Sequence, residues 1–345
     1  MDENKAYQLL QELLSCHAPA GREAEVDAIL QRELAQFGDR IRLSQDGAGN
    51  LIAHLPGDGP RVLVLAHKDE ISMAVAAIRE DGRLLVQNCG GSLPWKYGEG
   101  PVEIQTDSGW LRAILSVGSS HARTGPVAEL VKERALTWSD VTLFSGRSPR
   151  ELAELGIHVG SRAVVSRERK QLQTLGHYVA SYALDDRLGL VALVWALEQL
   201  LAEPPALDLH FVFSSSEEIG LLGAIHAAQQ LRPEIAIAID TSPVAHGSGA
   251  VLDARPIIWS RELVYHDPEE CAALLRLAAS LGFGAQAVLY DGAASDAAGI
   301  KKAGLAGRTV AFGFPRDNSH GFEIAHRAAL PNVTQLLVAY LRQLR

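Results

Sequence analysis

The stretch VLVLAHKDE at residues 62–70 places a histidine, a lysine and two acidic residues directly after a run of five apolar residues. A continuous apolar run is typical of a strand that helices cover on both faces of a parallel sheet. Unpaired charge is costly to bury, so the cluster that follows the run needs partners, a metal ion or contact with water. The stretch therefore predicts an α/β sheet with a polar site at the carboxyl end of this strand.

The two ends of the chain have the pattern of one α/β domain. The length of 345 residues exceeds what one hydrophobic core usually serves, so it favours two domains. We expect helices at residues 3–15 and 22–37, followed by short strands that lead into the apolar run. Alternation of helices and strands resumes near residue 176 and ends in a helix at 330–344.

The residues between these two regions have a different pattern. Short β-like runs such as RLLVQN and WLRAILSV alternate with turn signals such as EDG and TDSG, and helical patterning is confined to 126–135 and 149–155. The pattern predicts a small β-barrel or sandwich that interrupts the α/β domain. We expect the α/β domain at residues 1–71 and 171–345 and the inserted β-rich domain at 72–170.

The composition argues against several classes of protein. The chain has 41 acidic and 32 basic residues, a net charge of −9, and no long block of lysine or arginine, so we expect no nucleic-acid partner. The most apolar segment, 189–202, is interrupted by Glu198 and Gln199 and falls short of the ~20 apolar residues that span a bilayer. We therefore expect no membrane partner.

The cysteines and the N-terminal segment favour a cytoplasmic location. The 3 cysteines are far apart and form no CxxC pair, which indicates a reducing compartment and argues against a cysteine zinc site. The first residues, MDENKAYQLLQELL, have helical periodicity and lack the basic region and apolar core of a signal peptide.

Histidines and acids follow four apolar strands, and an aspartate pair precedes a helix. This set comprises His67, Asp69, Asp185, Asp186, Glu217, Glu218, Asp240 and His320. Ligands of open α/β sheets lie outside the carboxyl ends of the strands. We therefore expect these side chains to meet at one edge of the sheet, in an acidic pocket that cations would neutralise.

Each of these residues also has an ordinary structural interpretation. A single histidine after a strand is usually a loop residue, and acids at a helix start often cap it. Together, however, the residues supply the imidazole and carboxylate mixture that divalent metals prefer. The adjacent Glu217 and Glu218 could provide one metal ligand and one free base that deprotonates water. The set therefore predicts a two-metal hydrolase site.

Motifs along nearly the whole chain resemble those of metallopeptidase family forty-two, the glutamyl and TET-type dinuclear-metal aminopeptidases, some of which have been labelled cellulases or endoglucanases. The similar segments are APAGREAEV, DGAGNLIAHLPG, AHKDEI, LGIHVGSR, ALDDRLG, SSEEIGLLGA, AIAIDTSP, GAASDAAGI and NSHGFE. The resemblance implies a large mixed-sheet α/β domain of the phosphorylase/hydrolase type with an inserted PDZ-like β-barrel. It also implies pairing through the inserted domain, in homo-oligomers from a dimer to a dodecamer.

The resemblance assigns two divalent ions per chain to five residues. It implies that His67 and Asp240 bind one ion, that Glu218 and His320 bind the other, and that Asp185 bridges the two. Zinc is the expected metal, with cobalt and manganese as alternatives, because such sites choose weakly among these ions.

The resemblance also assigns residues that would not bind metal directly. Glu217 would be the general base, and Asp69 would hold the imidazole of His67 in place. The peptide bond between Asp185 and Asp186 is typically cis in related sites. Glu70 is expected at the pocket wall.

The chain departs from the family pattern at a few positions. Relatives usually have an apolar residue at position 68 and a glycine at position 72, where this chain has Lys68 and Ser72. Strand alternation should point Lys68 away from the metals, toward an acidic partner, and a contact with an anionic substrate is the alternative. Relatives also commonly have serine after the last histidine and an acid four residues on, whereas His320 is followed by Gly321 and, three residues on, by Glu323.

The expected activity is hydrolysis of N-terminal residues from short peptides that have a free N-terminus. One alternative is a metal-dependent amidase or deacylase that acts on a small peptide-like metabolite. Another is a non-catalytic oligomeric relative in which Lys68 replaces a metal ion. A glycosidase would need two carboxylates alone and would leave the histidines unexplained.

Overall fold

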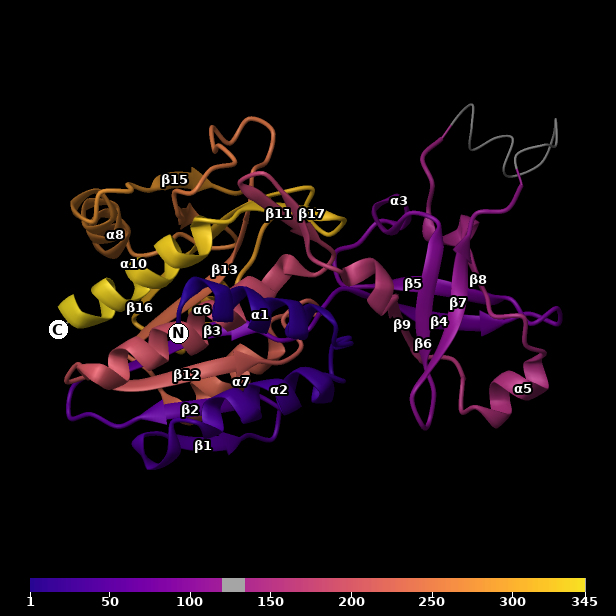
Figure 1. Ribbon diagram of the computed structural model, residues 1–345, viewed down its shortest axis with the longest axis horizontal. Coiled ribbons are helices and arrows are strands. Elements are labelled where there is room, and N and C mark those ends of the chain that lie inside the picture. The colour runs from indigo at the N-terminus through magenta and orange to yellow at the C-terminus, as the bar shows by residue number, and fades with distance from the viewer. Residues whose placement is uncertain (120–133, 345) are drawn as a thin grey trace.

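The computed structural model of the protein describes residues 1–119 and 134–344, which form an α/β unit and a smaller β-barrel beside it (Figure 1). The sheet of the α/β unit has eleven strands. Nine of them follow one another in the spatial order β1 (Arg42–Gln45), β2 (Leu51–Leu55), β12 (Asp208–Ser214), β3 (Arg61–His67), β13 (Ile235–Pro243), β16 (Arg308–Asp317), β17 (Glu323–His326), β11 (Tyr178–Ser181) and β10 (Gln173–Leu175). The other two branch from this order, because β14 (Ile257–Arg261) pairs with β16 and β15 (Gln286–Leu289) pairs with β14. Strands β12, β3, β13 and β16 are parallel to one another, and the outer strands are antiparallel to their neighbours except for β15, which is parallel to β14. The sheet is therefore mixed, as expected.

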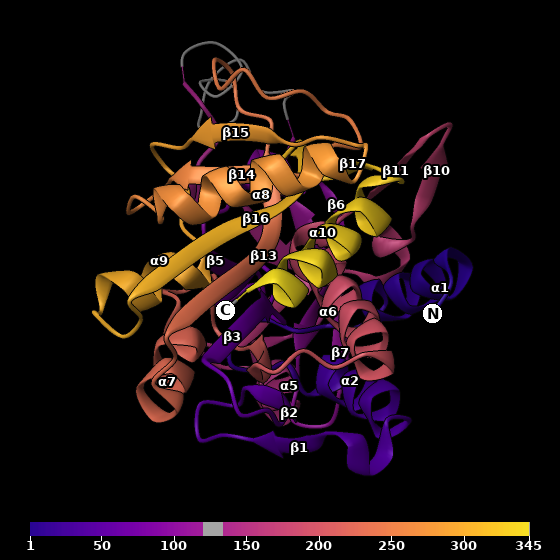
Figure 2. The ribbon, with the colours of Figure 1, turned by 90° about the vertical axis from the view of Figure 1, so that its left-hand side faces the viewer.

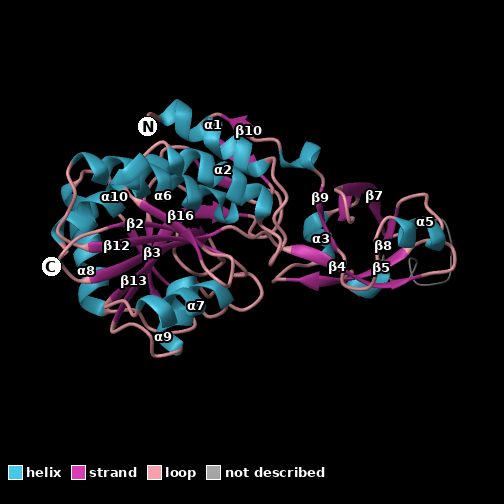
Figure 3. Ribbon diagram, turned by 90° about the horizontal axis from the view of Figure 1, so that it is seen from below, coloured by secondary structure: helices cyan, strands magenta, loops and turns pink. Residues whose placement is uncertain are grey.

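Helices cover both faces of the sheet (Figures 2 and 3). One face carries α1 (Glu3–Leu14), α2 (Ala24–Ala35), α6 (Leu184–Ala202), α8 (Pro268–Ser280) and α10 (Ala329–Gln343), and the other carries α7 (Leu222–Leu231) and α9 (Asp296–Lys302). Strand β3 alternates between the two cores, because Val62 and Val64 pack with the first group and Leu63 and Leu65 with the second. Burial on both sides explains why its sequence is continuously apolar.

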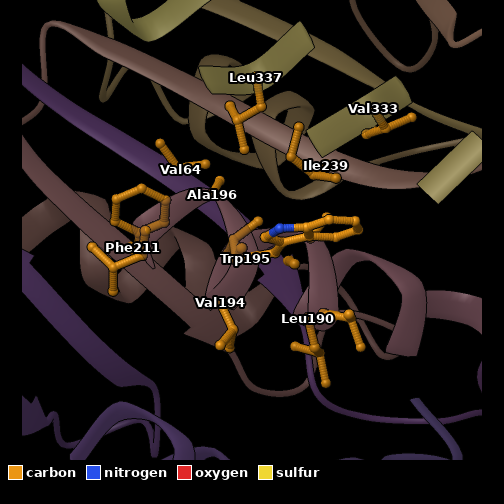
Figure 4. Close-up of a cluster of buried hydrophobic side chains, with 14 of the residues drawn as sticks. Val64, Leu190, Val194, Trp195, Ala196, Phe211, Ile239, Val333 and Leu337 are labelled. Carbon is orange, nitrogen blue, oxygen red and sulfur yellow. The ribbon is translucent and has the colours of Figure 1, made fainter. Parts of the chain in front are cut away.

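Helix α6 is the centre of the larger core. Its side chains from Leu184 to Leu197 are buried, with Val64 and Phe211 of the sheet and Leu337 of α10 in the same cluster (Figure 4). Fully burying one such side chain contributes about 1.5–3 kcal/mol. This packing fixes the start of α6, and with it Asp185, against the ends of the strands. Among the described residues, no helix has the length and apolar character needed to cross a membrane.

The barrel is a closed ring of six antiparallel strands with its own apolar core. In spatial order the strands are β4 (Ser72–Ile78), β5 (Leu84–Cys89), β8 (Thr142–Phe144), β7 (Trp110–Ser116), β6 (Gly100–Gln105) and β9 (Arg162–Val165). The expected inserted β-barrel is confirmed, whereas the domain boundaries at residues 71 and 170 stay a prediction.

Short helices complete the described part of the chain. They are α3 (Pro94–Tyr97), α5 (Pro149–Glu154) and the 3-10 turns η1 (Gly38–Arg40), η2 (Trp138–Asp140) and η3 (Arg167–Lys170). Helix α5 corresponds to the helix expected at 149–155. The helix expected at 126–135 falls mostly outside the described residues, and residues 134–135 are not helical.

Two buried lysines neutralise acids near the junction of the α/β unit and the barrel. The Nζ atom of Lys68 lies 2.5 Å from Asp27 and 2.7 Å from the carbonyl oxygen of Gly49. Lys68 thus points to an acidic partner, as strand alternation predicted. The Nζ atom of Lys170 lies 2.7 and 2.8 Å from the two carboxylate oxygens of Glu70.

We expect Lys170→Met to lower the free energy of unfolding by about 3 kcal/mol, because a buried carboxylate would lose its countercharge. Burial lowers the pKa of Lys170. Burial also opposes ionisation of Glu70, but the positive charges of Lys170 and Arg187 hold the pKa of Glu70 below its usual value. Urea unfolding of the variant and the unsubstituted protein measures the difference.

A matched control for this prediction is Arg150→Met, which removes an exposed pair with Glu154. An exposed pair contributes about 0–1 kcal/mol. Adding Glu70→Gln to Lys170→Met should recover part of the loss. Equal effects of Lys170→Met and Arg150→Met would contradict the interpretation.

Candidate metal centre

The structure brings the five predicted ligands and the predicted base to one cavity of about 150 Å³ at the carboxyl ends of the central strands. His67 ends β3, Asp240 lies in β13, and Asp185 is near the start of α6. The remaining three follow strands in loops and are Glu217, Glu218 and His320. Glu70, expected at the pocket wall, lines a smaller neighbouring cavity instead, and its carboxylate faces Lys170.

The imidazole of His67 is held through one ring nitrogen, and the other ring nitrogen faces acids of the cavity. Its Nδ1 atom lies 3.0 Å from the backbone carbonyl oxygen of Asp69, which can accept only from a protonated Nδ1. Its Nε2 atom lies 3.3 Å from Oδ1 of Asp185 and 4.0 Å from Oε2 of Glu217. The backbone bond therefore selects the tautomer in which Nε2 can bind a metal.

The imidazole of His320 is held in the same way, by the barrel. Its Nδ1 atom lies 2.8 Å from the carbonyl oxygen of Gly91, in the loop after β5. Its Nε2 atom lies 3.4 Å from Oδ2 of Asp185 and 3.8 Å from Oε1 of Glu218. The inserted barrel thus contributes directly to the orientation of a candidate ligand.

Asp185 lies between the two histidines. Its Oδ1 atom faces His67 and its Oδ2 atom faces His320, and the hydroxyl of Thr241 donates to Oδ1 at 2.8 Å. One carboxylate oxygen directed to each of two metal positions is the geometry that a bridging ligand requires. The peptide bond between Asp185 and Asp186 is cis, as the resemblance implied.

Two overlapping sets of ligand atoms are close enough to surround metal ions. In the first, His67, Asp185 and Glu218 each offer an atom within 4.8 Å of the others, and in the second His67, Asp186 and Asp240 do so. Sequence reasoning placed Asp186 in the acidic pocket but did not include it among the metal ligands. Its carboxylate accepts from the backbone N–H groups of His67, at 3.3 Å, and Gly189, at 3.1 Å, so it also fixes the strand end.

Asp69 holds the loop that carries both glutamates. Its two carboxylate oxygens accept from the backbone N–H groups of Glu217, at 2.9 Å, and Glu218, at 3.1 Å. The Nδ1 atom of His67 is farther from this carboxylate, at 3.6 Å, than from the Asp69 carbonyl oxygen. The contact of Asp69 with the glutamate loop was not anticipated from the sequence.

We expect Asp69→Asn to reduce turnover by about 10- to 100-fold, because one amide oxygen cannot accept both N–H groups and the loop would shift. Steady-state kinetics on the metal-loaded variant measures the effect. Asp58→Asn, at an exposed position, is the control for loss of a negative charge. Unchanged turnover in Asp69→Asn would contradict a positioning role.

The acids of the cavity carry more negative charge than the buried site can easily hold. Burial raises the pKa of Glu217 and Asp240 well above the usual values, and neighbouring carboxylates raise it further. Burial likewise raises the pKa of Glu218 to about 7. Burial opposes protonation of His320, but Asp185 and Glu218 raise its pKa to about 9. Divalent cations fit this donor set, because they would neutralise the charge that protons otherwise neutralise.

Sequence reasoning also missed a buried ion pair beside Asp185. The side chain of Arg316 is 3% exposed and its Nη1 atom contacts Asp185 and Glu323. Burial opposes ionisation of Asp185, but Arg316 and the two histidines hold its pKa well below the usual value. Glu323 also accepts from the backbone N–H groups of Asp185, at 3.0 Å, and His320, at 2.9 Å. Glu323 therefore fixes two candidate ligands, even though it lies three residues after His320 and not four as is common in relatives.

A mixed α/β sheet, an inserted barrel and histidines and acids gathered at the strand ends define the architecture of a metallopeptidase. The sequence model of the M42 glutamyl aminopeptidase family matches residues 49–336. The chain therefore belongs to this family, and the resemblance described above is confirmed.

Two relatives resemble about two thirds of the chain. A lysyl aminopeptidase of Pyrococcus furiosus is 32% identical over 237 residues, which cover 65% of this chain and 66% of that protein. The putative aminopeptidase FrvX of Escherichia coli is 30% identical over 237 residues, which cover 68% of this chain and 64% of that protein. The matched segment spans just under two thirds of the length of both relatives.

A solved structure shares the fold over nearly the full length. The TET1 peptidase of Pyrococcus horikoshii is 26% identical, with a TM-score of 0.85, and the match covers 98% of this chain and 100% of that one. The predicted fold class, an α/β metallopeptidase domain with an inserted β-barrel, is therefore confirmed.

Proposed function

We propose that this chain is an aminopeptidase that uses two divalent metal ions to remove N-terminal residues from short peptides. The observation that carries the proposal is the arrangement around Asp185, where two imidazoles direct their Nε2 atoms at opposite oxygens of one carboxylate. Each ring is fixed through its other nitrogen by a backbone carbonyl group. A site preorganised in this way suits metal binding better than simple ion pairing.

The donor set suits two metal positions that share Asp185. His67 and Asp240 would hold one ion, and Glu218 and His320 would hold the other. Divalent ions bound here would polarise the scissile carbonyl group and make water more acidic. We propose zinc, because imidazole accompanies carboxylate at both positions, with cobalt or manganese as alternatives that metal analysis distinguishes.

Glu217 is the proposed general base. Its side chain lines the cavity and is not needed as a ligand in this assignment. A Glu217 oxygen would take a proton from the attacking water while the water oxygen bonds to the carbonyl carbon. The same carboxyl group would then give the proton to the amide nitrogen as the C–N bond breaks.

An adjoining cavity of about 630 Å³ can receive the substrate. It is lined by Glu217, Glu218 and His320 on the side of the candidate metal centre and by Leu221, Ile225 and Leu263 elsewhere. The apolar residues would contact a substrate side chain, and the acids would attract a free α-ammonium group. This arrangement favours peptides with an unblocked N-terminus.

Lys68 does not support the alternative of a non-catalytic relative. Its Nζ atom faces Asp27 and Gly49, away from the cavity, so it does not replace a metal ion. Arg316 is the cation that contacts Asp185. Among the described residues, its guanidinium group makes no hydrogen bond to the Nε2 atom of either histidine.

We also propose a cytoplasmic homo-oligomer, between a dimer and a dodecamer, with no nucleic-acid partner. The TET1 peptidase of Pyrococcus horikoshii can assemble into a tetrahedron or a large octahedral shell. The barrel of this chain exposes Leu93, Trp95 and Phe144, with 50%, 53% and 45% of their surface accessible. Exposed aromatic and aliphatic side chains of this kind are common in interfaces.

The test of the proposed activity compares unblocked and N-acetylated aminoacyl anilides and short peptides as substrates of the metal-loaded protein. Cleavage of unblocked substrates alone would support an aminopeptidase. Cleavage of N-acetylated substrates, or no cleavage of either with two metal ions bound, would contradict it and favour the amidase or deacylase alternative.

A further inference from the structure

A second group of histidines and an acid lies at the opposite end of the sheet. His54 of β2 and His210 of β12 are direct partners across an antiparallel strand pair. Asp208 starts β12, two residues before His210, so both side chains leave the strand on the same face. Ser214, at the other end of β12, pairs with His67. Six residues of strand correspond to about 20 Å, so this group is remote from the candidate metal centre.

The three side chains converge. The Nε2 atom of His54 lies 2.6 Å from Oδ1 of Asp208, and the Nε2 atom of His210 lies 3.5 Å from Oδ2. The two imidazole rings are stacked, with centroids 4.1 Å apart and planes inclined by 5°. Each residue offers a ligand atom within 4.8 Å of those of the other two. Two imidazoles and one carboxylate are a donor set that zinc and similar ions bind.

His210 is an independent indication of a missing ligand. The residue is 6% exposed, and neither of its ring nitrogens has a hydrogen-bond partner among the residues that the structure describes. An unsatisfied buried polar group costs about 1–3 kcal/mol. Its separation from Asp208 is too long for a good hydrogen bond. A cation between the three residues would give the Nε2 atom a partner.

We propose that His54, His210 and Asp208 form an accessory site for a divalent transition-metal ion such as Zn²⁺. The rings would tilt from their parallel stacking so that both Nε2 lone pairs point at one position, and water would complete the coordination. Arg61 donates from Nε to Oδ2 of Asp208 at 2.7 Å and would orient the carboxylate from outside. The ion would join β2 to its neighbour β12 near the start of β12, so its effect is on stability and not on the chemistry at the remote cavity.

The competing interpretation is that Asp208 is only the centre of an ion-pair cluster with His54 and Arg61. Cobalt titration of the metal-free, full-length protein distinguishes the two, with stoichiometry measured by calorimetry and visible absorption. We expect the unsubstituted protein to bind one more Co²⁺ per chain than His54→Gln. His226→Gln, a substitution on the exposed side of α7 where His226 contacts Gln230, should bind as much as the unsubstituted protein.

Equal stoichiometry in all three proteins would overturn the proposal. The comparison does not depend on the proposed aminopeptidase function, because the difference between the proteins persists whatever the remote cavity binds. Turnover should be unchanged in both variants, which separates this site from the candidate metal centre.

A second measurement needs no substitution and therefore holds even if His54→Gln does not fold. Acylation of histidines by diethyl pyrocarbonate, followed by peptide mass spectrometry, reports the reactivity of His54 with and without Zn²⁺. Zn²⁺ should slow modification of His54 and leave that of the control residue His226 unchanged. Equal rates for His54 under both conditions would also overturn the proposal.

Discussion

Glu217→Gln should reduce turnover by about 10³-fold or more, while the protein keeps its fold and its metal ions. Glutamine has nearly the same size and can still donate its backbone N–H to Asp69. It cannot accept a proton from water. Because the proposed assignment leaves Glu217 free of metal, the substitution removes proton transfer alone.

Two measurements separate this effect from others. The turnover number with an unblocked aminoacyl anilide reports proton transfer, and elemental analysis reports the metal content of the same sample. Glu234→Gln, at an exposed position after α7, is the matched control and should behave like the unsubstituted protein. A Glu217→Gln protein that keeps most of its turnover would exclude Glu217 as the base, and one that loses metal would make it a ligand.

The positions of the candidate ligands could be predicted because they depend on a simple property of parallel strands. Strands β3, β12 and β13 are in register and parallel, so their carboxyl ends lie at one edge of the sheet. His67 and Asp240 lie near those ends, and Glu218 follows one of them. The direction of the Lys68 side chain could be predicted for a similarly local reason, since adjacent residues of an extended strand point in opposite directions.

The partners of these residues could not be predicted, because they come from distant parts of the chain. Lys68 pairs with Asp27, which is 41 residues away, and Asp185 contacts Arg316, which is 131 residues away. Arg316 belongs to the segment PRDNS, whose composition is that of a surface turn. Its burial results from the pairing of β16 with β13 and from the position of α6, neither of which is visible in the local pattern.

The role of Asp69 shows the same limit at shorter range. The resemblance implied that Asp69 would hold the imidazole of His67 in place. The carboxylate lies 3.6 Å from the Nδ1 atom of His67 and also accepts two backbone N–H groups from the loop after β12. Backbone donors carry no signal in the sequence, so a contact of this kind can be found only once the loop conformation is known.

Asp185→Ala should remove both metal ions and, with them, all measurable turnover. Each of its carboxylate oxygens faces one of the two histidines, so the substitution takes a ligand from both metal positions. It also leaves Arg316 with Glu323 as its remaining acidic contact near the cavity, which adds uncompensated positive charge where cations should bind. Elemental analysis after dialysis against metal-free buffer measures the loss, and circular dichroism checks that the fold is retained.

Asp291→Ala is the matched control, because Asp291 is an exposed aspartate that pairs with Arg261. It should retain the metal content of the unsubstituted protein. Retention of both ions by Asp185→Ala would exclude the bridging role. Retention of a single ion would show that His67, Asp186 and Asp240 bind one metal without Asp185, which the proximity of their ligand atoms permits. In that case Asp185 would belong to the His320 position alone, and Asp186, which the resemblance did not assign as a metal ligand, would take its place beside His67.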